Sequence, residues 1–261
     1  MSTEHSAARE RLAALPHDTR IAVVTGASSG IGEATARELA RLGTVQRLLG
    51  IRAAGRTRGA VPRGGGGPAL PLDVTDAESC AAFCAAVPRL HVLVNNAGGA
   101  KGTSTVMDAD EDQWRWMWET NVLGTLRLVR GLMPVLVETG DGLVVTITSI
   151  AALESYDNGS GYTSAKHAQA VLHRTLRGEH LGQPVRFTEI APGMVETEFS
   201  LVRFEGDDDK AGAVYRGLTP MVAQDIAEIV GFVASRPSHV NLDTIVVKPR
   251  DQHSAMRAHR R

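Results

Sequence analysis

The chain has 261 residues, of which 43% are hydrophobic and 22% charged, and its formal net charge is −1. This composition is typical of a globular protein, and the length fits one large α/β domain or two small ones. A net charge near zero argues against a nucleic-acid or membrane-surface role, because such proteins usually show a clear basic excess. The first residues lack the apolar core of a secretory signal, and no apolar run is long enough to cross a membrane, so we expect a cytoplasmic protein.

Apolar runs and helical patterns alternate along the chain. Continuous apolar runs predict strands buried on both faces at residues 20–26, 89–98, 142–150, 184–193 and 241–249. Helical spacing predicts helices at residues 32–43, 76–87, 110–139, 160–182 and 219–235. The last helix opens with Thr219 and Pro220, which suit the N-cap and the first helical position. This alternation predicts an α/β fold with a three-layer, doubly wound, mostly parallel sheet that binds its ligand at the carboxyl ends of the strands.

The glycine-rich stretch TGASSGIG, residues 25–32, joins the first predicted strand to the first of these helices. Gly26, Gly30 and Gly32 allow a tight turn and let the backbone approach a pyrophosphate, whose charge the helix N-terminus favours. The spacing is moderately specific, and a purely structural turn is the alternative. Asp73 and Val74 follow a short strand, and Asn95, Asn96 and Gly98 end the next one, so several polar turns converge on one crevice.

The two cysteines and the three tryptophans are better explained by packing than by a metal site or a nucleic-acid site. Cys80 and Cys84 are four residues apart in a helical pattern, but a metal site would need further ligands at suitable spacing, and none occur nearby. We therefore predict no metal and interpret both as small helix-face residues of a reduced protein. Trp114 and Trp118 lie one helical turn apart, while Trp116 points elsewhere, which favours packing within the protein or against a neighbouring subunit over base stacking.

Ser149, Tyr162 and Lys166 form the candidate catalytic group. A tyrosine and a lysine four residues apart lie on one face of a helix. Acting as a base near pH 7 to 8 requires a downward shift of the tyrosine pKa by roughly 2–3 units, which a close ammonium group in a partly dry site could largely supply. Ser149, at the end of a predicted strand, would donate a hydrogen bond to the substrate oxygen.

With these motifs the chain resembles the short-chain dehydrogenase/reductase family over nearly its whole length. The matching motifs are TGASSGIG (25–32), Asp73-Val74, NNAG (95–98), Asn121, Ser149, YTSAK (162–166) and APG (191–193). The resemblance implies a Rossmann-like, seven-stranded sheet with helices on both faces, in one domain over residues 1–261 with flexible ends at 1–19 and 250–261. It also implies a homodimer or homotetramer built through the helices at about 108–139 and 160–181.

The same resemblance assigns roles to individual residues. Tyr162 would be the acid/base, Lys166 would also bind the nicotinamide ribose, Ser149 would orient the substrate, and Asn121 would hold a water in a proton relay. The segment PGMVETEF, residues 192–199, would cover the nicotinamide. The predicted cofactor-binding residues are Gly26, Ser28, Ser29, Gly30, Ile31, Gly32, Arg52, Asp73, Val74, Asn95, Ala97, Gly98, Tyr162, Lys166, Pro192, Gly193, Val195 and Thr197.

The segment at residues 44–70 decides the predicted cofactor. It contains five arginines, seven glycines and no acid, whereas an enzyme that prefers NAD places an acid on the adenosine ribose here. We therefore predict NADP rather than NAD, with Arg52 near the 2′-phosphate and Arg56 or Arg58 as alternatives. Four consecutive glycines and two prolines also predict a short or irregular crossover in place of a helix.

Three segments downstream of the YTSAK motif, residues 197–211, 218–230 and 235–252, resemble the branch that contains NADP-dependent 3-hydroxy acid and serine dehydrogenases. A carboxylate on the substrate would need a cation, and Arg203 is the first candidate, with Lys101 and Tyr156 at the same mouth as weaker ones. One alternative is an aldehyde or ketone reductase with no carboxylate requirement, and another is a non-catalytic dinucleotide sensor. A nucleic-acid partner is not expected, because aromatics do not interleave with the arginines.

Overall fold

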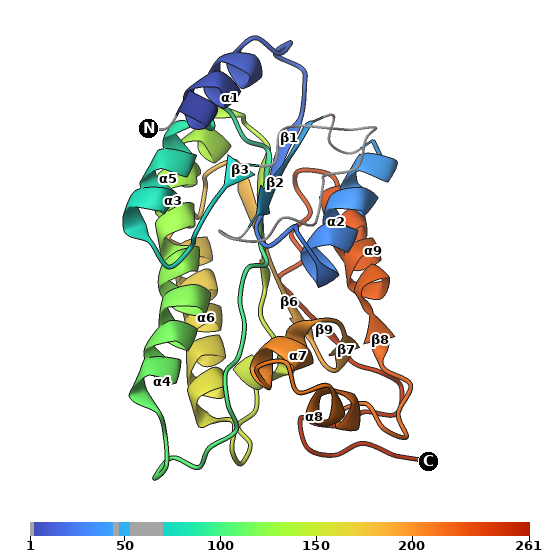
Figure 1. Cartoon of the computed structure of the whole chain (residues 1–261). Coiled ribbons are helices and arrows are strands. Elements are labelled where there is room, and N and C mark those ends of the chain that lie inside the picture. The colour runs from blue at the N-terminus through green and yellow to red at the C-terminus, as the bar shows by residue number, and fades with distance from the viewer. Residues whose placement is uncertain (1–2, 44–46, 53–69) are drawn as a thin grey trace.

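The computed structural model describes residues 3–43, 47–52 and 70–261 (Figure 1). The main strands are β1 (Ile21–Val24), β2 (Arg47–Arg52), β3 (Leu70–Pro71), β4 (Val92–Asn95), β5 (Gly142–Ile147), β6 (Val185–Pro192) and β9 (Thr244–Val247). They form a seven-stranded sheet in the order β3-β2-β1-β4-β5-β6-β9, with every neighbouring pair parallel. The predicted fold class is confirmed.

Helices cover both faces of this sheet. They are α1 (Thr3–Ala13), α2 (Gly30–Arg41), α3 (Ala77–Ala85), α4 (Glu111–Trp118), α5 (Gly124–Glu138), α6 (Ser160–Glu179) and α9 (Ala223–Ala234). In Figure 1, α3, α5 and α6 lie on one side of the sheet, and α2 and α9 lie on the other. Strand β1 shows the reason for its continuous apolar run: Ile21 and Val23 enter one buried cluster, and Ala22 and Val24 enter the other.

The helix predicted over residues 110–139 contains an interruption. Between α4 and α5 lies a π-helical turn, η1 (Glu119–Leu123), in which the N–H of Gly124 bonds to the carbonyl of Glu119. Gly124 packs tightly here, since a Cβ on it would lie 2.9 Å from Cβ of Val74. Single π-turns inside α-helices occur frequently at functional sites, and this one contains Asn121.

The predicted start of the helix at 219–235 is wrong. Thr219 and Pro220 precede a short strand, β8 (Met221–Val222), which pairs with β7 (Val195–Glu196), and α9 begins at Ala223. The pairing keeps residues 221–222 extended, so the helix cannot begin at Pro220. The carboxylate of Asp225 accepts the N–H of Val222 at 2.8 Å and stabilises the later start.

The two ends that the sequence predicts to be flexible both contact the rest of the chain. On α1, Ala8 and Leu12 are buried in the core. Near the C-terminus, Gln252 pairs with Ala258, and the Arg260 guanidinium donates to the carbonyl of Arg216. The predicted irregular crossover, with Arg56 and Arg58, lies outside the described residues.

Candidate active site

A large cavity of about 900 Å³ lies at the carboxyl ends of the strands. Most of the predicted site residues line it. These are Gly26, Ser28, Ser29, Gly30, Ile31, Asp73, Val74, Ala97, Gly98, Ser149, Tyr156, Tyr162, Lys166, Pro192, Gly193, Val195, Thr197 and Arg203. Residues that are far apart in the sequence therefore meet at one place.

The phosphate loop runs from β1 into α2, and its glycines are required by its geometry. Gly26 and Gly30 have left-handed backbones, with φ of 67° and 54°. Gly32 does not line the cavity but packs on the loop, since a Cβ there would lie 2.3 Å from the carbonyl oxygen of Gly26. The first N–H groups of α2 have no acceptors within the helix and lie at the cavity. This arrangement suits an anionic phosphate.

The predicted cofactor residue Asn95 is buried at the end of β4 and does not line the cavity. Its neighbour Asn96 does, and the sequence did not distinguish the two. Asn96 joins the two strand ends, because its Nδ2 donates to the carbonyl of Thr25 at 2.9 Å and its backbone N–H donates to Thr25 Oγ1 at 2.8 Å. Arg52 is the last residue of β2, and its side chain lies outside what the structure describes.

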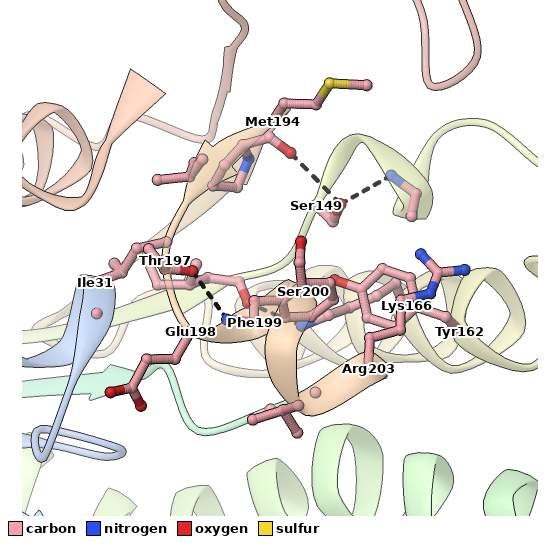
Figure 2. Close-up of a pocket in the computed structure, with 18 of the residues that line it drawn as sticks. Ile31, Ser149, Tyr162, Lys166, Met194, Thr197, Glu198, Phe199, Ser200 and Arg203 are labelled. Atoms are coloured by element: carbon pink, nitrogen blue, oxygen red, sulfur yellow. Dashed lines mark hydrogen bonds between the residues drawn. The ribbon is translucent and has the colours of Figure 1, made fainter. Parts of the chain in front are cut away.

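Ser149, just after β5, and Tyr162, in the first turn of α6, lie close together in the cavity (Figure 2). Tyr162 is only 8% exposed. Burial raises its pKa, while a hydrogen bond with Ser149 and the charge of Arg203 act in the opposite direction. The expectation of a lowered tyrosine pKa is therefore not met in this structure, because the loss of hydration outweighs the favourable interactions.

Lys166 lies one turn further along α6, with its Nζ 5.8 Å from the centre of the Tyr162 ring. Its ammonium group donates to the carbonyl of Ile147 at 3.2 Å and to Oε1 of Gln169 at 2.8 Å. Burial lowers the pKa of Lys166 to about 7, and the charge of Glu189 acts in the opposite direction.

Asn121 is fully buried in the π-helical turn and does not line the cavity. Its Nδ2 donates to the carbonyls of Gly99 at 2.9 Å and Met117 at 2.7 Å, and its Oδ1 accepts the N–H of Gly99 at 3.2 Å. A Cβ on Gly98 would lie 2.6 Å from this Oδ1. The side chain thus fixes the loop after β4, and only a glycine at 98 permits its approach.

Residues 197–217, which we call the lid segment, cover one side of the cavity with two short helices, α7 (Phe199–Arg203) and α8 (Asp208–Ala213). Figure 2 shows Phe199 and Arg203 on the side of the cavity that holds Tyr162. The Phe199 and Tyr162 rings are 5.5 Å apart. Arg203 anchors the lid segment, because its Nε donates to the carbonyl of Gly102 at 3.3 Å while its own carbonyl accepts the N–H of Gly102 at 3.2 Å.

The third substrate candidate, Lys101, does not line the main cavity. Its Nζ lies 4.7 Å from the centre of the Trp116 ring, and Trp116 lines the cavity. The tryptophans do not divide as their helical spacing predicts: Trp114 and Trp116 both pack against a small cluster around Tyr162, whereas Trp118 is 43% exposed.

Sequence reasoning missed several cavity residues from the lid segment and the C-terminal residues. The cavity is also lined by Ser200, Val202, Phe204, Tyr215, Gln252, Ala255, Met256 and Arg260. Aromatic residues in a segment without strand or long-helix periodicity were the one available signal. Gln252 gave none, although its Oε1 accepts the N–H of Met194 at 2.8 Å.

Within the described residues, no three His, Cys, Asp or Glu side chains gather as a metal ion would require. Cys80 and Cys84 are free thiols on α3, and burial raises the pKa of Cys80 to about 11 and that of Cys84 to about 12. Also within the described part of the chain, no helix is long and apolar enough to span a membrane.

Comparisons with known proteins identify the family of this chain. The short chain dehydrogenase family matches residues 20–207. An uncharacterized oxidoreductase of Mycobacterium tuberculosis (strain ATCC 25618 / H37Rv) is 64% identical over 238 residues, covering 91% of this chain and 94% of that protein. The NADP-dependent 3-hydroxy acid dehydrogenase of Schizosaccharomyces pombe (strain 972 / ATCC 24843) is 37% identical, covering 94% of this chain and 98% of that protein.

A solved structure is similar over the same length. The closed form of serine dehydrogenase complexed with NADP+ has a TM-score of 0.85 and 32% sequence identity, and the match covers 92% of this chain and 100% of that chain. The resemblance inferred from the sequence motifs is confirmed.

Proposed function

Since the chain belongs to the short-chain dehydrogenase family and is an oxidoreductase, we propose that it interconverts a secondary alcohol that bears a carboxylate, such as a 3-hydroxy acid, and the corresponding carbonyl compound, using NADP(H). Two similar proteins support the proposal. One is the NADP-dependent 3-hydroxy acid dehydrogenase, and the other is serine dehydrogenase, whose structure was solved in complex with NADP+.

The cavity has the features that a dinucleotide needs. Left-handed glycines and the N-terminus of α2 would hold the pyrophosphate. Asp73 and Val74 would hold the adenine, and Pro192, Gly193, Val195 and Thr197 would hold the nicotinamide end. When bound, NADP(H) supplies or accepts the hydride.

The protein's own side chains would handle the proton. In the oxidation direction, the Tyr162 oxygen would take the proton of the alcohol hydroxyl while the hydride leaves the carbon that bears this hydroxyl, and in reduction Tyr162 would return a proton to the carbonyl oxygen. Ser149 donates a hydrogen bond to that oxygen and stabilises the charge that builds on it. In its charged form, Lys166 would favour the phenolate of Tyr162.

The position of Arg203 in the cavity is the observation that favours an acidic substrate. Its Nη1 lies 3.5 Å from the Tyr156 hydroxyl, in the cavity that contains Ser149 and Tyr162. Among the described residues, no carboxylate pairs with it. A partly buried guanidinium with remaining donors is a suitable partner for a carboxylate, which it can bind through two hydrogen bonds.

The experiment is an initial-rate screen with NADP(H) and NAD(H) over 3-hydroxy acids, their methyl esters, β-keto acids, aldehydes and ketones. We expect kcat/KM to be at least about tenfold higher with NADP+ than with NAD+, and similarly higher for each acid than for its ester. Equal rates on acids and esters would favour the alternative, a ketone or aldehyde reductase without a carboxylate requirement. Cofactor binding without turnover of any compound would indicate a dinucleotide sensor.

We also propose a homodimer or homotetramer formed through α4, α5 and α6. Trp118 on α4 and Val171 on α6 are 43% and 59% exposed, and such apolar side chains are suited to an interface. Light scattering of wild type and Val171→Glu would test this, with a smaller mass expected for the variant.

A further inference from the structure

We propose that Gln169 is a positioning residue, which aims the ammonium group of Lys166 into the cavity and connects it to the π-helical turn that contains Asn121. The inference rests on the proposed acid–base function of Tyr162 and Lys166. It concerns a residue that neither lines the cavity nor belongs to the YTSAK motif.

Gln169 stands at the centre of a buried chain of hydrogen bonds. Its Oε1 accepts from Lys166 Nζ at 2.8 Å, and its Nε2 donates to Thr125 Oγ1 at 2.9 Å. Thr125 Oγ1 donates in turn to the carbonyl of Asn121 at 2.9 Å. All four residues are buried, with exposed fractions between 0% for Gln169 and Asn121 and 4% for Lys166 and Thr125. The chain therefore links α6 to the π-helical turn without solvent.

The chemistry of the donors permits one direction for this chain. An ammonium group has donors and no acceptor, so the oxygen of the Gln169 amide must face Lys166. The amide nitrogen must then face Thr125, whose hydroxyl accepts from it and donates to a carbonyl. Such head-to-tail bonds polarise one another. A leucine or valine at position 169 would fill the space but supply neither end of the link.

The result is a lysine with a fixed orientation. Of its three N–H donors, one is used by the carbonyl of Ile147 and one by Gln169. The third is thereby directed to the remaining side, where Lys166 lines the cavity. Without Gln169 the ammonium group keeps one of these two acceptors and can turn about its Cε–Nζ bond.

Other charged and titratable groups also affect the pKa values of Lys166 and Tyr162. Glu189 on β6 raises the pKa of Lys166, and Tyr156 and Arg203 act on Tyr162 from the loop before α6 and from α7. Gln169 is neutral, so its contribution is a hydrogen bond to the charged form of Lys166. Removing that bond disfavours the ammonium ion and weakens its support of the Tyr162 phenolate.

The test is the pH dependence of kcat/KM for alcohol oxidation in wild type, Gln169→Leu and Gln169→Glu. For Gln169→Leu we expect the acidic limb, which reports deprotonation of Tyr162, to move to higher pH by roughly 0.5–1 unit, with kcat reduced about tenfold. Gln169→Glu keeps an acceptor and adds a negative charge, so its profile should not move upward. A purely structural residue would lower the amount of active enzyme in both variants without moving either profile.

Thr125 supplies a matched pair in case Gln169→Leu does not fold. Thr125→Val removes the hydroxyl that orients Gln169, and its profile should shift in the same direction by a smaller amount. Thr125→Ser keeps the hydroxyl and should restore the wild-type profile. A wild-type profile in both Gln169→Leu and Thr125→Val would overturn the inference.

Two further variants, Tyr162→Phe and Lys166→Ala, test the proposed function on its own. If these two variants retain wild-type turnover, the acid–base proposal fails and the inference about Gln169 fails with it. If they are inactive while the Gln169 and Thr125 profiles stay unchanged, only the positioning function of Gln169 is refuted.

Discussion

The guanidinium of Arg203 lies beside the ring of Tyr156, with its Cζ 5.9 Å from the ring centre and its Nη1 3.5 Å from the hydroxyl oxygen. A cation near an aromatic face is stabilised by the ring quadrupole, so the ring holds Arg203 in place without neutralising it. Because the backbone of Arg203 is also tied to Gly102, the charge is presented from a fixed part of the lid segment.

Replacing Arg203 should weaken the binding of negatively charged substrates and leave that of uncharged substrates nearly unchanged. For Arg203→Met we expect KM for hydroxy acids to rise roughly 10- to 100-fold, since a charge-assisted hydrogen bond contributes about 1.5–3 kcal/mol. The KM for the matching methyl esters should change little. Steady-state kinetics on both substrate series measures this.

Arg236→Met is the matched control, because Arg236 also lies over an aromatic ring, 4.2 Å from the centre of Phe232, but outside the cavity. It should leave both substrate series unchanged. An equal rise of KM for acids and esters in Arg203→Met would contradict a carboxylate site.

Loss of the Tyr162 hydroxyl should affect the chemical step and spare cofactor binding. For Tyr162→Phe we expect kcat to fall by roughly 10²- to 10⁴-fold, the usual contribution of a general acid–base group. Binding of NADPH, followed by quenching of Trp116 fluorescence in the cavity, should stay within about threefold of wild type. Turnover within tenfold of wild type would show that another group transfers the proton.

The fold could be predicted well because its signals are local and redundant. The central strands are buried as predicted, and β5 and β6 match their predicted ranges closely. The prediction of a strand buried on both faces at 241–249 is wrong, because β9 lies at the edge of the sheet and its residues alternate between exposed and half-buried. The short strands β7 and β8 could not be predicted, since two residues have no periodicity and the pairing of Val195 with Met221 joins distant segments. Thr219 and Pro220 suit a helix start on local grounds, and the tertiary pairing overrides that preference.

The site could be predicted where the chemistry is contained in one motif. Tyr162 and Lys166 share a helix face, and a spacing of four residues reveals this. Arg203 could be placed only as a candidate, and Trp116 could not be placed at all, because a helical pattern does not tell which face meets a cavity. Gln169, three residues after Lys166, was within reach of spacing arguments, but its partner Thr125 lies on another helix.

A substitution in the phosphate loop should act through the backbone. In Gly32→Ala the new Cβ would lie 2.3 Å from the carbonyl oxygen of Gly26 and 2.7 Å from its carbonyl carbon, so the loop must move. We expect NADPH binding to weaken at least about tenfold and the free energy of unfolding to fall by roughly 1–3 kcal/mol. Titration with NADPH and chemical denaturation measure the two effects.

Gly178→Ala provides the comparison for this variant. Gly178 is an exposed residue of α6, and a Cβ there would meet nothing within 4 Å. Alanine should therefore stabilise the protein by roughly 0.5–1 kcal/mol through helix propensity, with unchanged NADPH affinity. If Gly32→Ala behaved like Gly178→Ala, the tight approach of the loop would not be needed for the cofactor.

Burial of Lys166 should make stability depend on pH in a defined direction. Its pKa is about 7 in the folded chain and about 10.4 when unfolded. Between these values the unfolded chain binds more protons, so the free energy of unfolding rises with pH. Below pH 7 the lysine is charged in both states and the full cost of its burial is present, roughly 3–5 kcal/mol.

Lys166→Met removes this dependence, while the carbonyl of Ile147 and Oε1 of Gln169 lose their donor at every pH. The difference in melting temperature between variant and wild type should therefore favour the variant most at pH 6 and decline steadily up to pH 10. The expected change is roughly 2–4 °C for each kcal/mol. A constant difference over this range would mean that Lys166 keeps an ordinary pKa in the folded protein, held there by Glu189 and the two hydrogen bonds.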